Sequence, residues 1–560
     1  MKDRPSKGLN SPRQPWQQWL LLIGLLTLFL ALRLPGLGRF VTTDEALWLR
    51  RSANFYLAVS NQDWGDTFQS EHPGMVAQWA GAAAFAWIFP QYAQVGEPAV
   101  HDGELLRLME NRGVNPMEVL AAARFVLVLV HGAAFLACWP YARRLLGTRA
   151  AALGLGLIAL DPFTIAHQRL LHQDGLLASF MLLSVLAYAD HLREGRSSSL
   201  IVSGVAAGLA WLTKTPSWFL LPFMLGLTLW TGWKEKKKSV RQISLWLVPL
   251  VWGLVGLLIL FLLFPAMWAA PVDVLGQMGR YALGTAEGEY SGPVFFNGQV
   301  YPDGNLGGVG WIFYPLSYLW RSTPLTVLGW LLAAWAILRA GKKERGPAIA
   351  NVAVISAFAI LFVVFMNLGE KKFDRYMLPA IPALLLVAGW GFAQFAERVK
   401  FFRKPRWRGT ALLAIVLALQ LASAAPTFPY YLSYYNPLLG GSRKAPEVMM
   451  IGWGEGLDQA ASYLKGQPGA SGEEMAAWYS TSFNLLFNAE AGDIPVELQL
   501  GAEELETLLA KEYLVIYLHQ WQRGTPQNLL DELEGLEPEY VVRINGLEYV
   551  RVYHLGGDGE

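Results

Sequence analysis

The sequence has little charge, a single cysteine and almost no imbalance between basic and acidic residues. Charged residues make up 16% of the 560 positions, against about 25% in ordinary globular proteins. Cys138 alone cannot form an internal disulfide, which excludes a disulfide-stabilised secreted scaffold. With 45 Lys and Arg against 44 Asp and Glu, bulk charge indicates no nucleic-acid partner. The function must therefore depend on where the few charges lie.

Hydrophobic residues are abundant, at 53%, and they fall in long runs. A bilayer core about 30 Å thick needs about 20 mostly apolar residues per helix. The sequence therefore predicts a polytopic membrane protein with about eleven spans. These are 17–37, 117–141, 149–167, 175–192, 198–213, 217–233, 243–267, 323–339, 348–367, 376–397 and 410–426.

Basic residues precede the first run and then gather in every second connection between runs. Because cytoplasmic loops are rich in Lys and Arg, this alternation predicts a cytoplasmic N-terminus and, after eleven crossings, an outer C-terminus. The first run should remain as an anchor, since no small-x-small cleavage site follows it. We interpret the basic clusters as topology signals; they lie in 2–13, 143–149, 193–196, 234–241, 339–345 and 398–408.

The outer connections 38–116 and 268–322 are much longer than usual loops and are rich in aromatics, Gly and Pro, so we expect ordered, functional loops. After residue 427 the pattern changes to that of a small extracytoplasmic α/β domain, which leaves 1–426 as the membrane domain. Its predicted strands are 474–480, 513–518, 539–544 and 547–554, and its predicted helices are 502–511 and 527–534. Asn545-Gly546 predicts a tight hairpin turn. No catalytic motif stands out there, which favours a structural or acceptor-recruiting role.

Ionisable residues at the outer ends of spans are costly unless they are used. Asp44 and Glu45 directly follow the first run. On a helix they would point about 100° apart, so only one could face a central cavity. Either Thr43 or Asp44 could also cap a helix that begins at Glu45.

Two further clusters contain histidines next to other polar residues. His72, in Glu71-His72-Pro73-Gly74, suits a structural turn or a site. Asp174 could cap the helix that follows it, or it could bind a metal with His167 and His172, although their spacing matches no strong zinc signature. Lys214 could reach lipid phosphate from the membrane surface, or it could bind a ligand.

The segment 370–376 places three basic residues on the expected outer face, against the topology rule. Lys371, Lys372 and Arg375 therefore indicate an anionic ligand, for which Lys supplies a point charge and Arg a bidentate contact. Arg124, near the outer end of the second run, is a further candidate. Such cations would hold an anionic, membrane-borne substrate, while a carboxylate would be free to take a proton from an acceptor.

These residues resemble motifs of the membrane glycosyltransferases of the GT-C fold, in particular the protein O-mannosyltransferases and lipid A aminoarabinose transferases of glycosyltransferase family 39. The resemblance implies an all-α polytopic membrane domain of about eleven helices, followed by a small soluble α/β domain. Relatives often have a second proline where this chain has Gly74. The matching motifs are Asp44-Glu45, His72-Pro73-Gly74, Ala122-Ala123-Arg124, Asp174-Gly175, and the segments 208–214 and 372–379.

The resemblance implies inverting transfer of a sugar from a polyprenyl-phosphate carrier to an outer acceptor, which could be a protein, a lipid or a glycan. By position, Asp44 would be the general base and Glu45 the other candidate. Asp174 would position the acceptor, the donor, or a divalent cation where one is used. His72 and Tyr376 would position the acceptor. The residues expected to hold the phosphate are Lys214, Lys371, Lys372, Arg375 and Arg124.

Three alternatives remain at this stage. A transporter or flippase should place charges near mid-span and show paired broken helices, whereas these charges lie at the outer rim, and no strong internal repeat is present. A membrane-anchored sensor would bind its ligand in the tail. An enzyme that moves longer glycans from a pyrophosphate carrier would share most of these features.

Overall fold

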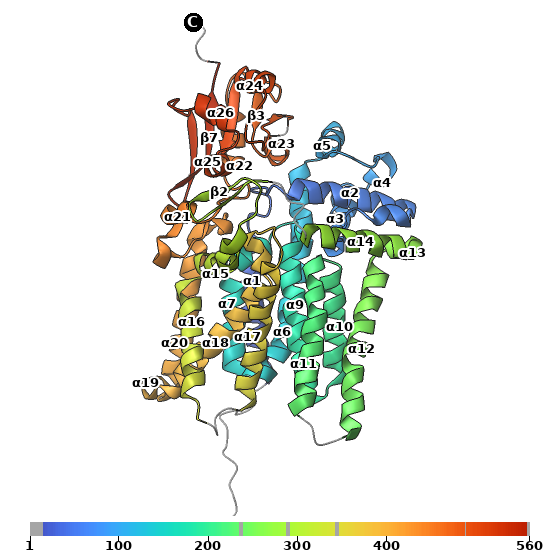
Figure 1. Cartoon of the computed structure of the whole chain (residues 1–560), viewed down its shortest axis with the longest axis vertical. Helices are drawn as coiled ribbons and strands as arrows, with labels where there is room; N and C mark the ends of the chain where they lie inside the picture. Colours follow the sequence, from blue (N-terminus) through green and yellow to red (C-terminus); the bar gives the residue numbers. More distant parts are fainter. Residues whose placement is uncertain (1–14, 235–238, 287–291, 342–345, 488, 557–560) are drawn as a thin grey trace, which may run out of the picture.

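The computed structural model describes residues 15–234, 239–286, 292–341, 346–487 and 489–556. Long helices form a bundle, shorter helices lie across one end of it, and a domain with a β-sheet covers that same end (Figure 1). The apolar runs contribute the helices of the bundle, and the strands of the larger sheet all lie after residue 474.

Each of the eleven apolar runs contains a helix, with shifted boundaries. The expected span 149–167 is divided at Asp161, which caps a second short helix, α8 Pro162–His167. The eleven helices are α1 Pro15–Ala31, α6 Pro116–Leu146, α7 Thr148–Leu160, α9 Gln173–Glu194, α10 Ser197–Trp211, α11 Leu220–Lys234, α12 Ser239–Leu263, α16 Pro324–Arg339, α17 Pro347–Asn367, α18 Ala380–Arg398 and α20 Arg406–Ala424.

Fewer helices than eleven have the dimensions of a full span. Among the described residues, six are long and apolar enough to cross a bilayer, and the bent pair Gly307–Arg321 and Pro324–Arg339, at 111°, would make seven. Several others are short: α7 has 13 residues and α10 has 15. The structure thus establishes a mostly helical chain with six or seven apolar spans, and eleven crossings stay a prediction.

The two long connections contain several short helices and two strands within the residues that the structure describes. In Figure 1 the helices α2, α3 and α14 lie across the end of the bundle. The first connection contains α2 Glu45–Asn61, α3 Met75–Ile88, α4 Tyr92–Val95 and α5 Asp102–Asn111; the second contains α13 Ala266–Ala269, α14 Pro271–Ala286, the antiparallel strands β1 Val294–Phe296 and β2 Gln299–Tyr301, and α15 Gly310–Arg321.

Close packing fixes α18 at the centre of the bundle. A Cβ atom added at Gly389 would lie 2.4 Å from the backbone nitrogen of Gly154 on α7, and one added at Gly391 would lie 2.1 Å from the carbonyl of Gly329 on α16. Small residues allow such close approach of helix backbones in membranes. The short 3₁₀ helix η4 Asp374–Met377, which directly precedes α18, is therefore anchored on a well-packed helix.

The tail forms a five-stranded mixed sheet in the order β4-β3-β5-β7-β6. The predicted hairpin is confirmed: β6 and β7 are antiparallel, and Asn545 and Gly546 have positive φ values of 52° and 80°. The predicted strand 474–480 is shorter, because Tyr479 adopts φ 62° and a helix begins at Ser480. The elements are β3 Met475–Ala477, β4 Gly492–Asp493, β5 Tyr513–Tyr517, β6 Tyr540–Ile544, β7 Leu547–His554, α22 Leu457–Leu464, α23 Ser480–Phe487, α24 Ala502–Leu509, α25 Leu518–Arg523 and α26 Gln527–Glu532.

Between α20 and α22, short 3₁₀ helices and the four-residue helix α21 Gly441–Lys444 join this sheet to the bundle. Arg321 of α15 donates to the carbonyls of Leu432 and Tyr434 at 2.5 and 3.4 Å. Ser482 of α23 donates to the carbonyl of Thr42 at 3.1 Å. The tail thus contacts the segment that leads into α2, and a domain boundary at 427 stays a prediction.

Candidate active site

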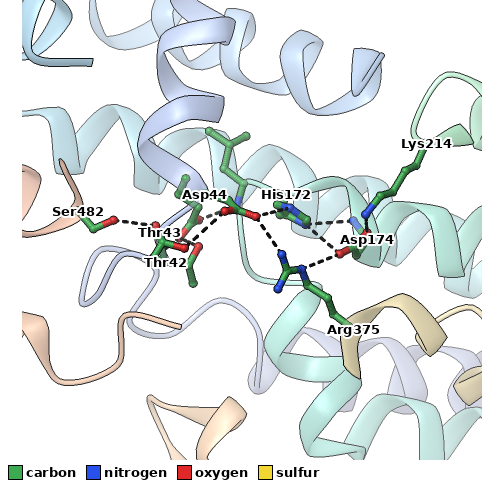
Figure 2. Close-up of polar contacts among 10 residues, drawn as sticks. Thr42, Thr43, Asp44, His172, Asp174, Lys214, Arg375 and Ser482 are labelled. Atoms are coloured by element: carbon green, nitrogen blue, oxygen red, sulfur yellow. Dashed lines mark hydrogen bonds and ion pairs between the residues drawn. The ribbon is translucent and has the colours of Figure 1, made fainter. Parts of the chain in front are cut away.

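Polar side chains from four segments that lie far apart in the sequence meet in one cluster (Figure 2). One carboxylate oxygen of Asp44 lies 3.3 Å from Nε2 of His172 and 3.5 Å from Nη2 of Arg375. The other end of each of these two side chains reaches Asp174, with His172 Nδ1 and Arg375 Nε both 3.5 Å from its Oδ2. Lys214 donates to Oδ1 of Asp174 at 2.8 Å. The two carboxylates therefore share one histidine and one arginine.

Each residue is held by the start or end of a regular element. Asp44 immediately precedes α2, and His172 is the N-cap of α9, where its ring accepts from the backbone nitrogen of Asp174. Asp174 lies in the first turn of α9, where a carboxylate is favoured by the helix dipole. Lys214 precedes the 3₁₀ helix η2 Thr215–Phe219, and Arg375 lies on η4.

The two carboxylates differ in how open they are. The side chain of Asp174 is 2% exposed and is committed to Lys214, whereas that of Asp44 is 35% exposed. Burial raises the pKa of Asp44, but the hydrogen bond from His172 and the charge of Arg375 outweigh this effect and hold the pKa below its ordinary value. Asp44 is thus ionised and accessible.

A first cavity of about 230 Å³ lies on one side of Arg375 and contains the cations Lys214, Lys371 and Arg375. Burial lowers the pKa of Lys371, and so do the charges of Lys214 and Arg375. The three cations therefore repel one another, and a bound anion would relieve that repulsion. Apolar side chains complete the wall; they include Leu177, Pro216, Phe365, Met366 and Leu368.

His72 and Tyr376 line this first cavity beside the cations. The ring of Tyr376 lies 4.2 Å from Nζ of Lys214, which is a favourable cation–π geometry. Burial, and then the charge of Lys214, lower the pKa of His72 to about 3, so its ring is neutral at pH 7. His72 can therefore orient a ligand by hydrogen bonding but adds no charge.

A second cavity of about 190 Å³ lies between the bundle and the tail, and Asp44 and Arg375 both reach it. Its wall includes Trp453, Tyr479 and Arg523 of the tail. The guanidinium of Arg375 stacks against Trp453 at 4.4 Å from the ring centroid. Arg375 thus separates the two cavities and contacts both.

Glu45 and Arg124, expected at the site, instead form a buried pair away from both cavities. Glu45 is 0% exposed and accepts from Arg124 Nε at 2.7 Å, from the backbone of Leu171 at 2.7 Å and from that of Thr42 at 2.9 Å. Arg124 also donates to the carbonyl of Phe40 at 2.8 Å. Both side chains are buried, and both hold the segment before Asp44 in place.

Lys372, expected to bind phosphate, caps a helix. Its Nζ donates to the carbonyls of Asn367 and Gly369 at 3.0 and 2.7 Å, at the C-terminal end of α17. Such carbonyls lack partners within their own helix, and a lysine satisfies them well. Lys371, the preceding residue, is the one that faces the first cavity.

The candidate metal ligands are not arranged as a set. Within the part of the chain that the structure describes, no group of three or more His, Cys, Asp or Glu side chains is placed to hold a metal ion. His172 lies between Asp44 and Asp174, and His167 packs edge-on against Phe163 at 4.6 Å. The expected combination of His167, His172 and Asp174 is therefore replaced by a hydrogen-bonding role for His172.

The glycine at position 74 has a structural reason. Gly74 has φ 54°, and an added Cβ atom would lie 2.2 Å from the ring of Trp48. Proline cannot adopt a positive φ, so the second proline of relatives does not fit here. The backbone nitrogen of Gly74 donates to the carbonyl of Thr213 at 3.0 Å, which ties the segment carrying His72 to the one carrying Lys214.

Trp453, which was not predicted as a site residue, contacts both Arg375 and His172. A signal for it was present in the alternating run Gly452-Trp453-Gly454-Glu455-Gly456. All three glycines have positive φ, and a Cβ atom at Gly454 would lie 2.2 Å from the carbonyl of Val41. The run marks where the tail backbone approaches the segment that carries Asp44.

Comparison with known proteins identifies the class of fold. A family model described as dolichyl-phosphate-mannose-protein mannosyltransferase matches residues 117–268, which include His172, Asp174 and Lys214. No curated protein sequence matches the chain. Among solved structures, the archaeal oligosaccharyltransferase AglB from Archaeoglobus fulgidus, in complex with an inhibitory peptide and a dolichol-phosphate, has a TM-score of 0.50 at 13% identity, covering 90% of this chain and 70% of that one.

The Saccharomyces cerevisiae protein O-mannosyltransferase Pmt1-Pmt2 complex, bound to its sugar donor, also has a TM-score of 0.50, at 12% identity over 75% of this chain and 90% of that one. ArnT from Cupriavidus metallidurans bound to undecaprenyl phosphate scores 0.48, at 15% identity over 96% and 98%. The chain has the fold of the GT-C membrane glycosyltransferases. Within that class, the resemblance to the protein O-mannosyltransferase type is confirmed.

We expect Arg124→Met to lower the free energy of unfolding by about 3–5 kcal/mol, because it leaves the carboxylate of Glu45 buried without its partner. Unfolding of the detergent-solubilised protein in denaturant measures this difference. Lys371→Met, which removes a cation from the cavity wall, is the matched control and should change stability much less. Equal stability of Arg124→Met and the wild type would contradict a structural role for the pair.

Proposed function

We propose that the protein is an integral-membrane glycosyltransferase that moves a sugar from a polyprenyl-phosphate carrier to an acceptor hydroxyl on the extracytoplasmic face. The observation that carries this proposal is the position of Arg375, which contacts Asp44 on the side of the second cavity and lines the cation-rich first cavity as well. Dolichol-phosphate in AglB and the sugar donor in Pmt1-Pmt2 support a lipid-linked donor.

The first cavity suits the phosphate of the carrier. Lys214, Lys371 and Arg375 supply positive charge at one place, and the apolar residues of α17 and η2 beside them suit the start of a lipid chain. Nε of Arg375 and Oδ2 of Asp174 are buried and have no hydrogen-bond partner among the described residues. Arg375 is therefore able to turn toward an anion without losing a well-formed hydrogen bond.

The second cavity suits the acceptor, with Asp44 as the general base. As the acceptor oxygen forms its bond to the anomeric carbon, its proton passes to the carboxylate of Asp44. The bond from the anomeric carbon to the phosphate oxygen breaks, and its electron pair leaves with the carrier phosphate. Lys214, Lys371 and Arg375 stabilise the charge that develops there. Asp174, locked to Lys214, positions this cation.

We propose that the sugar is transferred with inversion at the anomeric carbon, which the position of Arg375 between the two cavities supports. Acceptor and leaving group approach the sugar from opposite sides of Arg375, so a single displacement places the new bond opposite the old one. No side chain needs to form a covalent intermediate.

Donor binding also makes Asp44 a better base. In the free protein Arg375 and His172 hold the pKa of Asp44 low, so its carboxylate is ionised but weakly basic. A phosphate that engages Arg375 brings negative charge close to Asp44 and raises that pKa. Proton transfer thus becomes effective when the donor is in place.

The orientation proposed from the basic clusters is consistent with the location of the site. Helix α19 Lys400–Arg403, within one of these clusters, lies at the end of the bundle opposite the sheet domain (Figure 1). We therefore propose a multi-pass membrane protein with a cytoplasmic N-terminus and an extracytoplasmic tail, in which the site opens at the outer surface.

We expect Asp44→Asn to lower the rate of sugar transfer by about 10²–10⁴-fold, because the amide cannot take the proton of the acceptor. Transfer of radiolabelled sugar from a polyprenyl-phosphate donor measures the loss. Binding of the carrier should remain, as should the thermal stability of the protein. Asp63→Asn, an exposed carboxylate at the end of α2, is the control. Normal turnover by Asp44→Asn would remove Asp44 from this role.

Neighbouring lysines provide a test of the phosphate site. Lys371→Met should weaken binding of undecaprenyl phosphate about tenfold or more, because it removes one charged contact. Lys372→Met should leave that affinity nearly unchanged and lower the stability of the protein, because it uncaps α17. Titration of each purified variant with the carrier gives the two dissociation constants. Reversed effects would show that the cation facing the ligand has been misassigned.

The dependence of kcat on pH tests the contact between His172 and Asp44. The hydrogen bond from His172 lowers the pKa of Asp44, so His172→Phe should raise that pKa toward its ordinary value. A larger fraction of Asp44 is then protonated at a given acidic pH, and activity should fall at higher pH than in the wild type. The acid limb of the profile, measured with saturating donor, reports this shift. An unmoved acid limb would show that another group titrates.

A further inference from the structure

The second cavity is lined by equal numbers of arginines and carboxylates, but one arginine has no carboxylate partner among the described residues. Three arginines and three carboxylates line it. Arg321 pairs with Asp374 at 2.7 Å, and Arg375 with Asp44 at 3.5 Å. These contacts account for two cations and two anions, and leave Glu455 and Arg523.

Glu455 is held by its own segment and does not neutralise Arg523. Its carboxylate accepts from the backbone nitrogen of Trp453 and from the hydroxyl of Tyr517, the latter at 3.2 Å. Burial raises the pKa of Glu455, which reduces its value as a counter-charge. No ion pair between Glu455 and Arg523 forms in the described chain.

Arg523, at the end of α25, is a buried cation with an unusual partner. It is 8% exposed, and its Nε and Nη2 lie 3.3 and 3.2 Å from the sulfur of Met450. A thioether is a weak, uncharged acceptor. Across the described ranges of the chain, no carboxylate lies within 4 Å of Arg523. An isolated buried guanidinium is costly, and its planar donors match the two oxygens of a phosphate or carboxylate.

The wall next to Arg523 is also unusual. Tyr479 has φ 62°, a conformation that bulky residues rarely adopt, and its hydroxyl is hydrogen-bonded to Nδ1 of His519. Strained backbone of this kind tends to occur at ligand sites. Burial, followed by the charge of Arg523, lowers the pKa of His519 well below its ordinary value, so this ring adds no charge. Arg523 is thus the cation that the tail contributes to this cavity.

We infer that Arg523 is a specificity-determining residue, which binds an anionic group, phosphate or carboxylate, on an acceptor whose nearby hydroxyl faces Asp44. The inference rests on the proposed function, because it takes the second cavity as the acceptor site. Arg523 has no part in the bond changes. It fixes where the acceptor lies, and the donor cations are left to the carrier phosphate on the other side of Arg375.

Three small alcohols test this recognition: glycerol 3-phosphate, glycerate and neutral glycerol. Full-length protein in detergent is measured without the carrier and again after saturation with undecaprenyl phosphate, which occupies the donor cations. The dissociation constant of each alcohol is then obtained from its stabilisation of the folded protein against heat. At least one anionic alcohol should bind tenfold or more tightly than glycerol. The stronger of the two anions identifies the chemistry of the acceptor group.

Arg523→Met should abolish that preference, and Arg523→Lys, which keeps the charge but not the planar fork, should leave a smaller one. Arg543→Met is the matched control, since Arg543 lies on the same domain and is paired with Glu548 at 2.6 Å. It should bind as the wild type does. Arg523→Lys also keeps the test valid if the methionine variant does not fold.

Each result has one meaning. An unchanged preference in both Arg523 variants, or no anionic preference in the wild type, would overturn the inference. Loss of anion binding when undecaprenyl phosphate is added would place the anion in the first cavity, and would overturn it too. Failure of undecaprenyl phosphate itself to bind would instead contradict the proposed function.

Discussion

The site depends on one shared cation. Arg375 contacts Asp44 and Asp174 at once, and its two contacts are long, at 3.5 Å each. A guanidinium held between two carboxylates is kept in place by charge, while its geometry leaves room to reorient toward a third anion. Arg375 can therefore hold Asp44 and Asp174 in place and can also turn toward a bound anion. Arg375 also lines both cavities.

The surrounding structure fixes the positions of Asp44 and Arg375. Glu45, buried against Arg124, ties the segment before Asp44 to α6, and close contacts at Gly389 and Gly391 seat α18 directly behind η4. The pair of Glu45 and Arg124 lines neither cavity, and nor do the two glycines. Both restrict where Asp44 and Arg375 can lie, which matters because contacts of this length would be lost by small movements of either element.

Much of the fold and of the candidate site could be predicted from the sequence, but the contact partners of the charged side chains could not. Apolar runs indicate the helices, and basic clusters indicate which ends of the helices face the cytoplasm, because both are local properties of the sequence. An unexpected charge such as Lys214 then indicates where the candidate site lies. The pairing of Glu45 with Arg124 depends on which way each side chain points after folding. The same holds for Lys372, which caps a helix, and Lys371, which lines the first cavity. Spacing alone does not contain that information.

The contacts of the tail with the segment before Asp44 have a consequence for biosynthesis. Gly454 packs on Val41, and Ser482 donates to Thr42, so residues made late complete a wall around one made early. A nascent chain translated only as far as α20 still lacks the wall of the second cavity that the tail supplies. The cavity beside Asp44 is therefore complete only once α23 and the segment 452–456 have been made and have packed against residues 41–42.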